Sequence, residues 1–225
     1  HYWRCDDCDP VCINPAPLSH AAGVVAFTMC ALGATNVIMP KFDAGEVLAN
    51  IERFRATHIF LPPTAFYALL AHAEIRQHDY SSLRVFLLAG SPVSPDKLKQ
   101  GVEVFGPCMC QCYGQTEAPM VLTHLKKHEH DLTKPERLAS CGRPVPWMHL
   151  ALLGPDNVPV APGESGEICV RGDNVMMGYW REPELTRQAI RSGWLYTGDL
   201  GTVGDDGLIY HRGSRSSSIP LPDPF

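Results

Sequence analysis

The sequence lacks a surplus of basic residues and a long apolar segment. Its 225 residues include 19 lysines and arginines against 24 aspartates and glutamates, a formal charge of −5. This balance disfavours a nucleic-acid-binding surface. The longest apolar run, residues 21–34, is interrupted by Thr28 and Gly33 and is shorter than the about 20 residues that a membrane-spanning helix needs. No basic start followed by an apolar stretch marks a secretory signal, so we expect a cytoplasmic protein without an integral membrane segment.

The nine cysteines do not follow the pattern of a disulfide framework, because their number is odd and the chain is too large to need such staples. Three of them alternate in a stretch that resembles a strand: Cys108, Cys110 and Cys112. Residues two apart in a strand share a face, so this pattern predicts free, buried thiols on one side of a sheet.

Three further cysteines near the start allow a different interpretation. Cys5 and Cys8 have the spacing of a zinc knuckle, and Cys12 follows them. No second pair of cysteines or histidines lies at the usual distance. A small zinc-binding module is therefore the weaker alternative.

The first 135 residues alternate between strand and helix patterns. Short apolar runs predict strands at residues 36–39, 58–61, 83–88 and 108–112. Helical spacing and capping residues predict helices that begin after Asp43, at Thr64 and after Ser94. This order predicts an α/β fold with a mainly parallel, helix-covered sheet, in which ligands bind at the carboxyl ends of the strands.

From about Pro135 the sequence pattern changes to short predicted strands separated by frequent prolines and glycines. Strands are predicted at residues 148–153, 166–171, 194–196 and 208–211, with one helix at 184–190. This pattern predicts a small β-rich, barrel-like subdomain. We therefore divide the chain into an α/β part (1–135), a β-rich subdomain (136–212) and an atypical tail (213–225) that is rich in serine and proline and predicted to be disordered.

The stretch QCYGQTEAP, residues 111–119, does not end as a purely structural strand would. It runs from the cysteine strand into an aromatic ring, a glycine, a hydroxyl and a carboxylate: Tyr113, Gly114, Thr116 and Glu117. A tyrosine ring can stack on a base, and a carboxylate can hold a hard cation such as Mg²⁺. The stretch therefore predicts a nucleotide site.

Five stretches resemble, in the same order, motifs of the adenylate-forming superfamily. They are PLSHAAG (17–23), LLAGSPVSP (87–95), YGQTE (113–117), GEICVRGDNVMMGYW (166–180) and YTGDL (196–200). This superfamily contains acyl- and aryl-CoA synthetases, peptide-synthetase adenylation domains and beetle luciferases. The chain most resembles an acyl-CoA synthetase, or fatty-acid–CoA ligase, and would be part of that family's large N-terminal domain.

The resemblance implies an enzyme that joins a carboxylic acid to coenzyme A with ATP and Mg²⁺, through an acyl-adenylate and AMP. It places the nucleotide at Ala89, Gly90, Ser91, Tyr113, Gly114, Gln115, Thr116 and Asp199. Thr116 and Glu117 would be catalytic, with Glu117 also holding Mg²⁺. The acyl pocket would involve His20, Gly114 and Ala118. The apolar tract 21–32 and the residues after YGQTE favour a hydrophobic acid, fatty or aromatic.

The departures from the family pattern lead to a further expectation. Ser214 and Ser217 stand where the family's hinge has arginine and aspartate. The family's phosphate loop would precede residue 17, and its C-terminal domain, with a catalytic lysine, would follow Phe225. We therefore expect the chain to be an incomplete and inactive piece of the ligase. The main alternative is a non-catalytic nucleotide-binding remnant.

Overall fold

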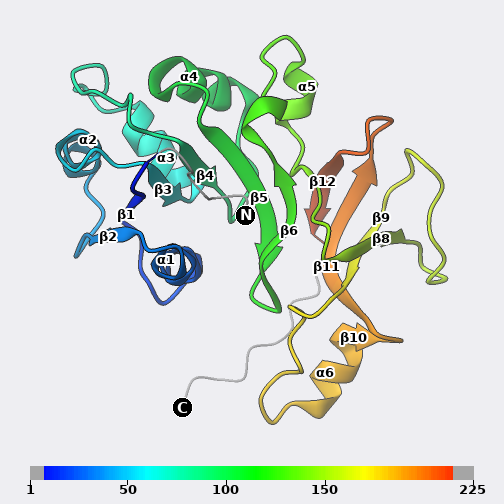
Figure 1. Ribbon diagram of the computed structural model, residues 1–225. Coiled ribbons are helices and arrows are strands. Elements are labelled where there is room, and N and C mark those ends of the chain that lie inside the picture. The colour runs from blue at the N-terminus through cyan, green and yellow to red at the C-terminus, as the bar shows by residue number, and fades with distance from the viewer. Residues whose placement is uncertain (1–7, 215–225) are drawn as a thin grey trace.

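The computed structural model describes residues 8–214 and contains two sheets (Figure 1). The larger, sheet A, has seven strands in the order β2 (Thr35–Ile38), β1 (Val11–Asn14), β3 (His58–Leu61), β4 (Val85–Leu88), β5 (Met109–Gln115), β6 (Ala118–Leu125) and β7 (Arg143–Pro144). The first five are parallel, and the last two pairings are antiparallel. The predicted α/β fold with a mainly parallel sheet is confirmed.

Helices cover both faces of sheet A. On one face lie α2 (Ala44–Arg53), α3 (Pro63–Leu70) and α4 (Pro95–Phe105), and on the other lies α1 (Ala21–Ala31) (Figure 1). Strand β3 shows the consequence: Ile59 and Leu61 pack on the first face, while Phe60 packs on the face of α1. Strands buried on both sides are mostly apolar, which explains the sequence VFLL of β4 and the residues 59–61 that follow the buried His58 in β3.

Local signals set most helix boundaries. The Asp43 carboxylate accepts a hydrogen bond from the amide of Glu46 at 2.9 Å and caps α2, as predicted. Helix α4 begins with Pro95, also as predicted. Helix α3 ends at Leu70, because the chain turns so that Ile75 packs into the core and its carbonyl accepts the hydroxyl of Tyr80 at 2.7 Å.

Strand β5 is longer than predicted and belongs to a hairpin. Thr116 and Glu117 form the turn that leads directly into β6, a strand that the sequence did not predict. Cys108, Cys110 and Cys112 are free and buried as predicted, but they do not all share a face. Cys110 and Cys112 face α1, whereas Cys108 packs on the opposite side. Cys108 precedes β5, so the two-residue alternation of a strand does not extend to it.

Sheet B is antiparallel. It contains β8 (His149–Leu153), β9 (Gly166–Arg171), β10 (Ile190–Arg191), β11 (Trp194–Val203) and β12 (Ile209–Ser214). Register shifts along β11 curl it into a half-barrel (Figure 1), which confirms the predicted β-rich, barrel-like region. Helix α6 (Pro183–Ala189) precedes β10. Residues 215–225 of the predicted tail lie outside the described residues.

The two sheets share a core. Ala118 and Leu122 of β6 pack with Ile168 of β9, Leu195 of β11 and Ile209 of β12. Two short elements, η1 (Lys127–Glu129) and α5 (Pro135–Leu138), connect β6 to β7. The shared core fixes sheet B against the hairpin of β5 and β6, where the YGQTE motif lies.

The described residues offer no support for the zinc alternative. Residues 8–214 contain no cluster of three potential metal-binding side chains. Cys5 lies outside the described residues, Cys8 is disulfide-bonded, and Cys12 is a free thiol inside sheet A. Burial raises the pKa of Cys12 to about 12, which disfavours the thiolate that a metal would need. Across the same residues, we find no helix with the length and apolarity that crossing a bilayer requires.

A buried histidine makes the stability of the fold depend on pH. His124 in β6 is 5% exposed, and burial lowers its pKa from 6.5 to about 4. Between these two pH values the unfolded chain binds more protons at His124 than the folded chain does. The free energy of unfolding therefore falls as the pH falls from about 6.5 towards 4. We expect this site to contribute on the order of 3 kcal/mol over the window.

Urea denaturation at a series of pH values measures this effect. His124→Gln is expected to flatten the pH dependence of the unfolding free energy, whereas His20→Gln, at an exposed site, leaves it as in the unmodified chain. Equal slopes for His124→Gln and the unmodified chain would contradict the assignment.

Candidate functional site

Two adjoining cavities meet at Asp199. The first cavity, about 310 Å³, is bounded by the loop after β4, by β5, by the segment after α5 and by the hairpin of β11 and β12. The second cavity, about 770 Å³, shares Asp199 and Ser214 with it and extends towards α6. The first lies beyond the carboxyl end of β4 and along the carboxyl-terminal half of β5, in the region where parallel sheets bind their ligands.

Five of the predicted nucleotide residues line the first cavity: Gly90, Ser91, Tyr113, Gly114 and Asp199. They come from three separate motifs of the sequence, which the fold brings to one place. Gln115 lines the second cavity instead. Ala89 is buried beneath α1, and Thr116 is exposed on the hairpin turn and lines neither cavity.

The carboxylate of Asp199 is the polar centre of the first cavity. The hydroxyl of Tyr113 donates to its Oδ2 atom at 2.7 Å. Burial, and then the neighbouring carboxylate, raises the pKa of Tyr113, so its phenol remains a donor. The Oδ1 atom accepts from the Ser214 hydroxyl and lies 3.3 Å from Nε2 of His211. Asp199 is therefore an oriented acceptor, held by groups from two different sheets.

His211 and Ser214 line this cavity but were not among the predicted site residues. The ring centroid of His211 lies 6.4 Å from that of Tyr113, with 48° between the ring planes. The pairing of β11 with β12 places Ser214 opposite Asp199. No local pattern in the sequence marks His211, because only this strand pairing brings it to the cavity.

A glycine is required at the second position of the YGQTE motif. A Cβ atom on Gly114 would lie 2.2 Å from the carbonyl oxygen of Met120, far inside contact distance. The close approach keeps the two strands of the hairpin together where β5 forms the cavity wall. Gly114 therefore has a packing role in addition to its position beside the first cavity.

Glu117 lies on the wall of the second cavity. Its Oε1 atom accepts the hydroxyl of Tyr179 at 2.8 Å. Burial, and then this carboxylate, raises the pKa of Tyr179 to about 12, so the tyrosine acts as donor. Glu167 lines the same cavity, and its Oε1 atom accepts the amide of Gly198 at 3.0 Å. Mg²⁺ usually takes one or two carboxylates and completes its shell with water and phosphate oxygens, so the donor set fits this ion.

An apolar cavity of about 350 Å³ lies between α1 and β6. Its lining includes Val24, Thr28 and Leu32 from one side and Met120 and Val121 from the other. These are the two segments whose apolar character favoured a hydrophobic acid.

The residues predicted for the acyl pocket are distributed differently. Gly114 lines the first cavity and lies against the backbone of Met120, a residue that lines the apolar cavity. His20 is exposed before α1, within 2.9 Å of the Ser19 hydroxyl, and Ala118 is fully buried in the core between the sheets. Neither lines the apolar cavity.

Comparison with known proteins finds relatives across nearly the whole chain. A family model described as AMP-binding enzyme matches residues 1–180. A medium/long-chain-fatty-acid–CoA ligase of Mycobacterium tuberculosis is 44% identical over 195 residues, which are 86% of this chain and 34% of the relative. A feruloyl-CoA synthase of Amycolatopsis is 41% identical over 198 residues, 87% of this chain and 39% of the relative. The chain thus spans a third to two fifths of the length of these relatives.

Solved structures give the same result for the fold. An amide bond synthetase from Marinactinospora thermotolerans superposes with a TM-score of 0.85 and 36% identity, covering 91% of this chain and 41% of that structure. The O-succinylbenzoate coenzyme A synthetase of Bacillus subtilis, in complex with ATP and magnesium ion, superposes with a TM-score of 0.81 and 30% identity. This superposition covers 96% of this chain and 44% of that structure. The arrangement of both sheets is therefore shared with these enzymes.

Proposed function

The chain belongs to the AMP-binding enzyme family, and on this basis we propose that its first cavity holds the adenosine of ATP in an acid–CoA ligase reaction. The observation that carries the proposal is the pairing of Tyr113 with Asp199 across this cavity. A base would stack on the tyrosine ring, and the carboxylate would accept the ribose hydroxyls. The backbone of Ala89, Gly90 and Ser91 would border the nucleoside on the β4 side.

The proposed reaction has two steps. A carboxylate oxygen of the acid attacks the α-phosphorus of ATP, and the bond to pyrophosphate breaks. The sulfur of coenzyme A then attacks the acyl carbon, and AMP leaves with the bonding electron pair. Thr116 would donate its hydroxyl to a phosphate oxygen, and Glu117 would hold Mg²⁺ in the second cavity. When bound, this ion would neutralise phosphate charge as the bond to pyrophosphate breaks.

The apolar cavity supports a hydrophobic acid as substrate. Its walls are mostly apolar, and one of its lining residues, Met120, lies against Gly114 of the proposed adenosine site. The relatives named above are ligases for fatty acids and for ferulate, two hydrophobic acids of different shape.

Binding measurements with acids test the acyl site. We expect dodecanoate or ferulate to bind in the presence of AMP, and Val24→Asp to weaken that binding. A short hydrophilic acid such as lactate serves as the control. Binding of lactate as tight as that of both hydrophobic acids would contradict the proposal.

We expect the 225 residues, assayed by themselves, to bind nucleotide without completing the reaction. The relatives with named ligase activity are more than twice as long as this chain. The assay is acid-dependent exchange of pyrophosphate into ATP, with a full-length ligase of this family as positive control. Exchange at a rate comparable with that control would contradict the expectation.

The alternative, a non-catalytic nucleotide-binding protein, has one observation in its favour. Ser214 and His211, rather than an arginine, surround the Oδ1 atom of Asp199. This alternative predicts AMP binding that acids neither strengthen nor weaken, whereas a ligase site predicts coupling between the two ligands. Titration of AMP with and without saturating acid distinguishes them.

A further inference from the structure

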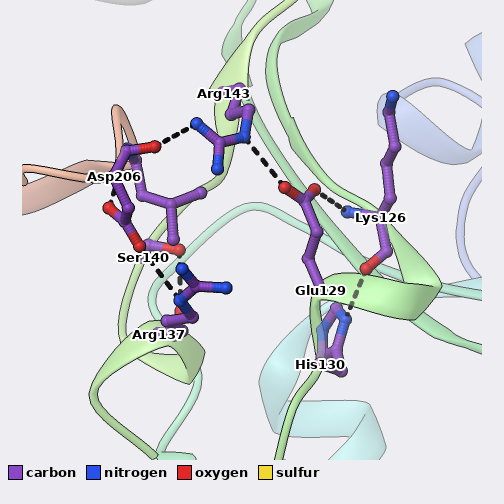
Figure 2. A network of polar contacts seen from close by, with 8 residues as sticks. Lys126, Glu129, His130, Arg137, Ser140, Arg143 and Asp206 are labelled. Carbon is purple, nitrogen blue, oxygen red and sulfur yellow. Dashed lines mark hydrogen bonds and ion pairs between the residues drawn. The ribbon is translucent and has the colours of Figure 1, made fainter. Parts of the chain in front are cut away.

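Two arginine side chains, one from α5 and one from β7, attach to the turn between β11 and β12. Asp206 lies in this turn, and Nε of Arg137 in α5 is 3.0 Å from its Oδ2 atom. Arg143 of β7 donates from Nη1 to the backbone carbonyl oxygen of Asp206. Figure 2 shows the two guanidinium groups converging on Asp206.

Arg143 is itself held in place from the opposite side. Its Nε atom donates to Oε1 of Glu129 at 2.9 Å, and the other oxygen of Glu129 accepts the amide of Lys126 at 3.0 Å (Figure 2). The Glu129 side chain is 13% exposed. Burial by itself would raise its pKa, but the bonds from Lys126 and Arg143 outweigh burial and hold the pKa below its usual value. Glu129 therefore stays ionised and orients Arg143.

These contacts lie directly behind the first cavity. Ser140 and Cys141, between the two arginines, line one wall, while Asp199 and His211 of the hairpin line another. The two walls are joined by a backbone bridge, in which Cys141 donates to the carbonyl of Ile209 at 2.8 Å. The arginine contacts thus act on the same junction as this bridge.

We propose that Arg137 and Arg143 are positioning residues that hold the β11–β12 hairpin against the cavity wall and thereby increase affinity for the nucleotide. This inference rests on the proposed function. Nucleotide binding needs Tyr113 of sheet A and Asp199 of the hairpin at a fixed separation, since they bind different parts of one ligand. A hairpin released at its turn moves Asp199 relative to Tyr113.

The burial of these side chains supports a role in positioning rather than in the core. Arg137 is 27% exposed, Asp206 24% and Arg143 43%, and none belongs to the apolar cluster between the sheets. Removal of the charges therefore leaves that apolar core intact. The ion pairs are shielded enough to favour one hairpin position, which fully exposed pairs do only weakly.

The experiment is a double-mutant cycle on Arg137 and Asp206 with AMP as the probe. We expect Arg137→Gln and Asp206→Asn each to weaken AMP binding about tenfold, the effect of losing one charge-assisted contact. The double variant should be no weaker than either single variant. Exchange of the charges, Arg137→Asp with Asp206→Arg, should restore much of the affinity. Arg53→Ala, which removes an arginine contact with Phe54 just after α2, is the control and should leave affinity unchanged.

Hydrogen exchange provides a readout that a general loss of stability would not give. Arg137→Gln should speed exchange in residues 194–214 without changing α2 and α3. Unchanged AMP affinity in both single variants, with binding by the unmodified chain, would overturn the inference. So would equal loss of protection throughout the chain. Failure of the unmodified chain to bind AMP would instead remove the proposed function on which the inference rests.

Discussion

Replacement of Asp199 by alanine is expected to abolish measurable AMP binding in a calorimetric titration. In the proposed complex this carboxylate accepts both ribose hydroxyls, and a hydrogen bond to a charged group contributes about 1.5–3 kcal/mol. Loss of two such bonds corresponds to a weakening of roughly 100-fold or more. The variant also removes the acceptor of the Tyr113 and Ser214 hydroxyls, so the cavity loses its polar centre.

Two further variants separate the role of charge from that of shape. Asp199→Asn keeps the size of the side chain and removes its charge, so it should bind AMP nearly as poorly as the alanine variant. Tyr113→Phe keeps the aromatic face and removes only the bond to Asp199, so it should bind within about tenfold of the unmodified chain. Equal AMP affinity in the unmodified chain and in Asp199→Ala would place the nucleotide elsewhere.

The second large effect is expected at Gly142, which precedes β7. Its φ angle is 93°, a conformation that costs other residues roughly 1–2 kcal/mol. A Cβ atom there would lie 2.0 Å from the carbonyl carbon of His124 and 2.1 Å from the amide nitrogen of Leu125. Both are backbone atoms of β6, so no rotation of a side chain relieves the clash. We expect Gly142→Ala to lower the unfolding free energy by about 4 kcal/mol or to prevent folding.

Gly33→Ala is the matched control for this variant. Gly33 has a similar φ angle of 76°, but nothing lies within 4 Å of the position of its Cβ atom. Gly33→Ala should therefore lower the unfolding free energy only by the cost of the backbone conformation, about 1–2 kcal/mol. Urea denaturation followed by circular dichroism measures both. Equal destabilisation by the two substitutions would show that contact with β6 has no energetic effect.

The fold could be predicted where local patterns decide it. The fully buried strand β4 is a continuous apolar run, β3 is apolar after His58, and the cap at Asp43 is set by residues three apart. Strand β6 was missed because its sequence, APMVLTHL, has no simple alternation, since it faces α1 at one point and sheet B at another. Strand β7 has two residues, one of them proline, and is defined only by its partner.

The candidate site was predictable in its motifs but not in its contacts. Tyr113, Gly90 and Asp199 belong to three recognisable stretches, and all three line the first cavity. His211 could not be found, because the register between β11 and β12 depends on a bulge at Leu200 and Gly201. The acyl assignment of His20 came from a motif resemblance, which does not specify how a side chain is oriented after folding.

The pairing of Tyr113 with Asp199 has a consequence for the order in which the molecule is assembled. The two residues are 86 positions apart. A ribosome that adds about 5–20 residues per second takes about 4–17 s to pass from one to the other. During this interval β5 has been made but the β11–β12 hairpin, which forms the opposite wall of the first cavity, has not. The nucleotide site is therefore incomplete. If the proposed site binds AMP, the nucleotide would therefore stabilise only the folded domain, and it would slow unfolding of the native chain instead of accelerating early folding.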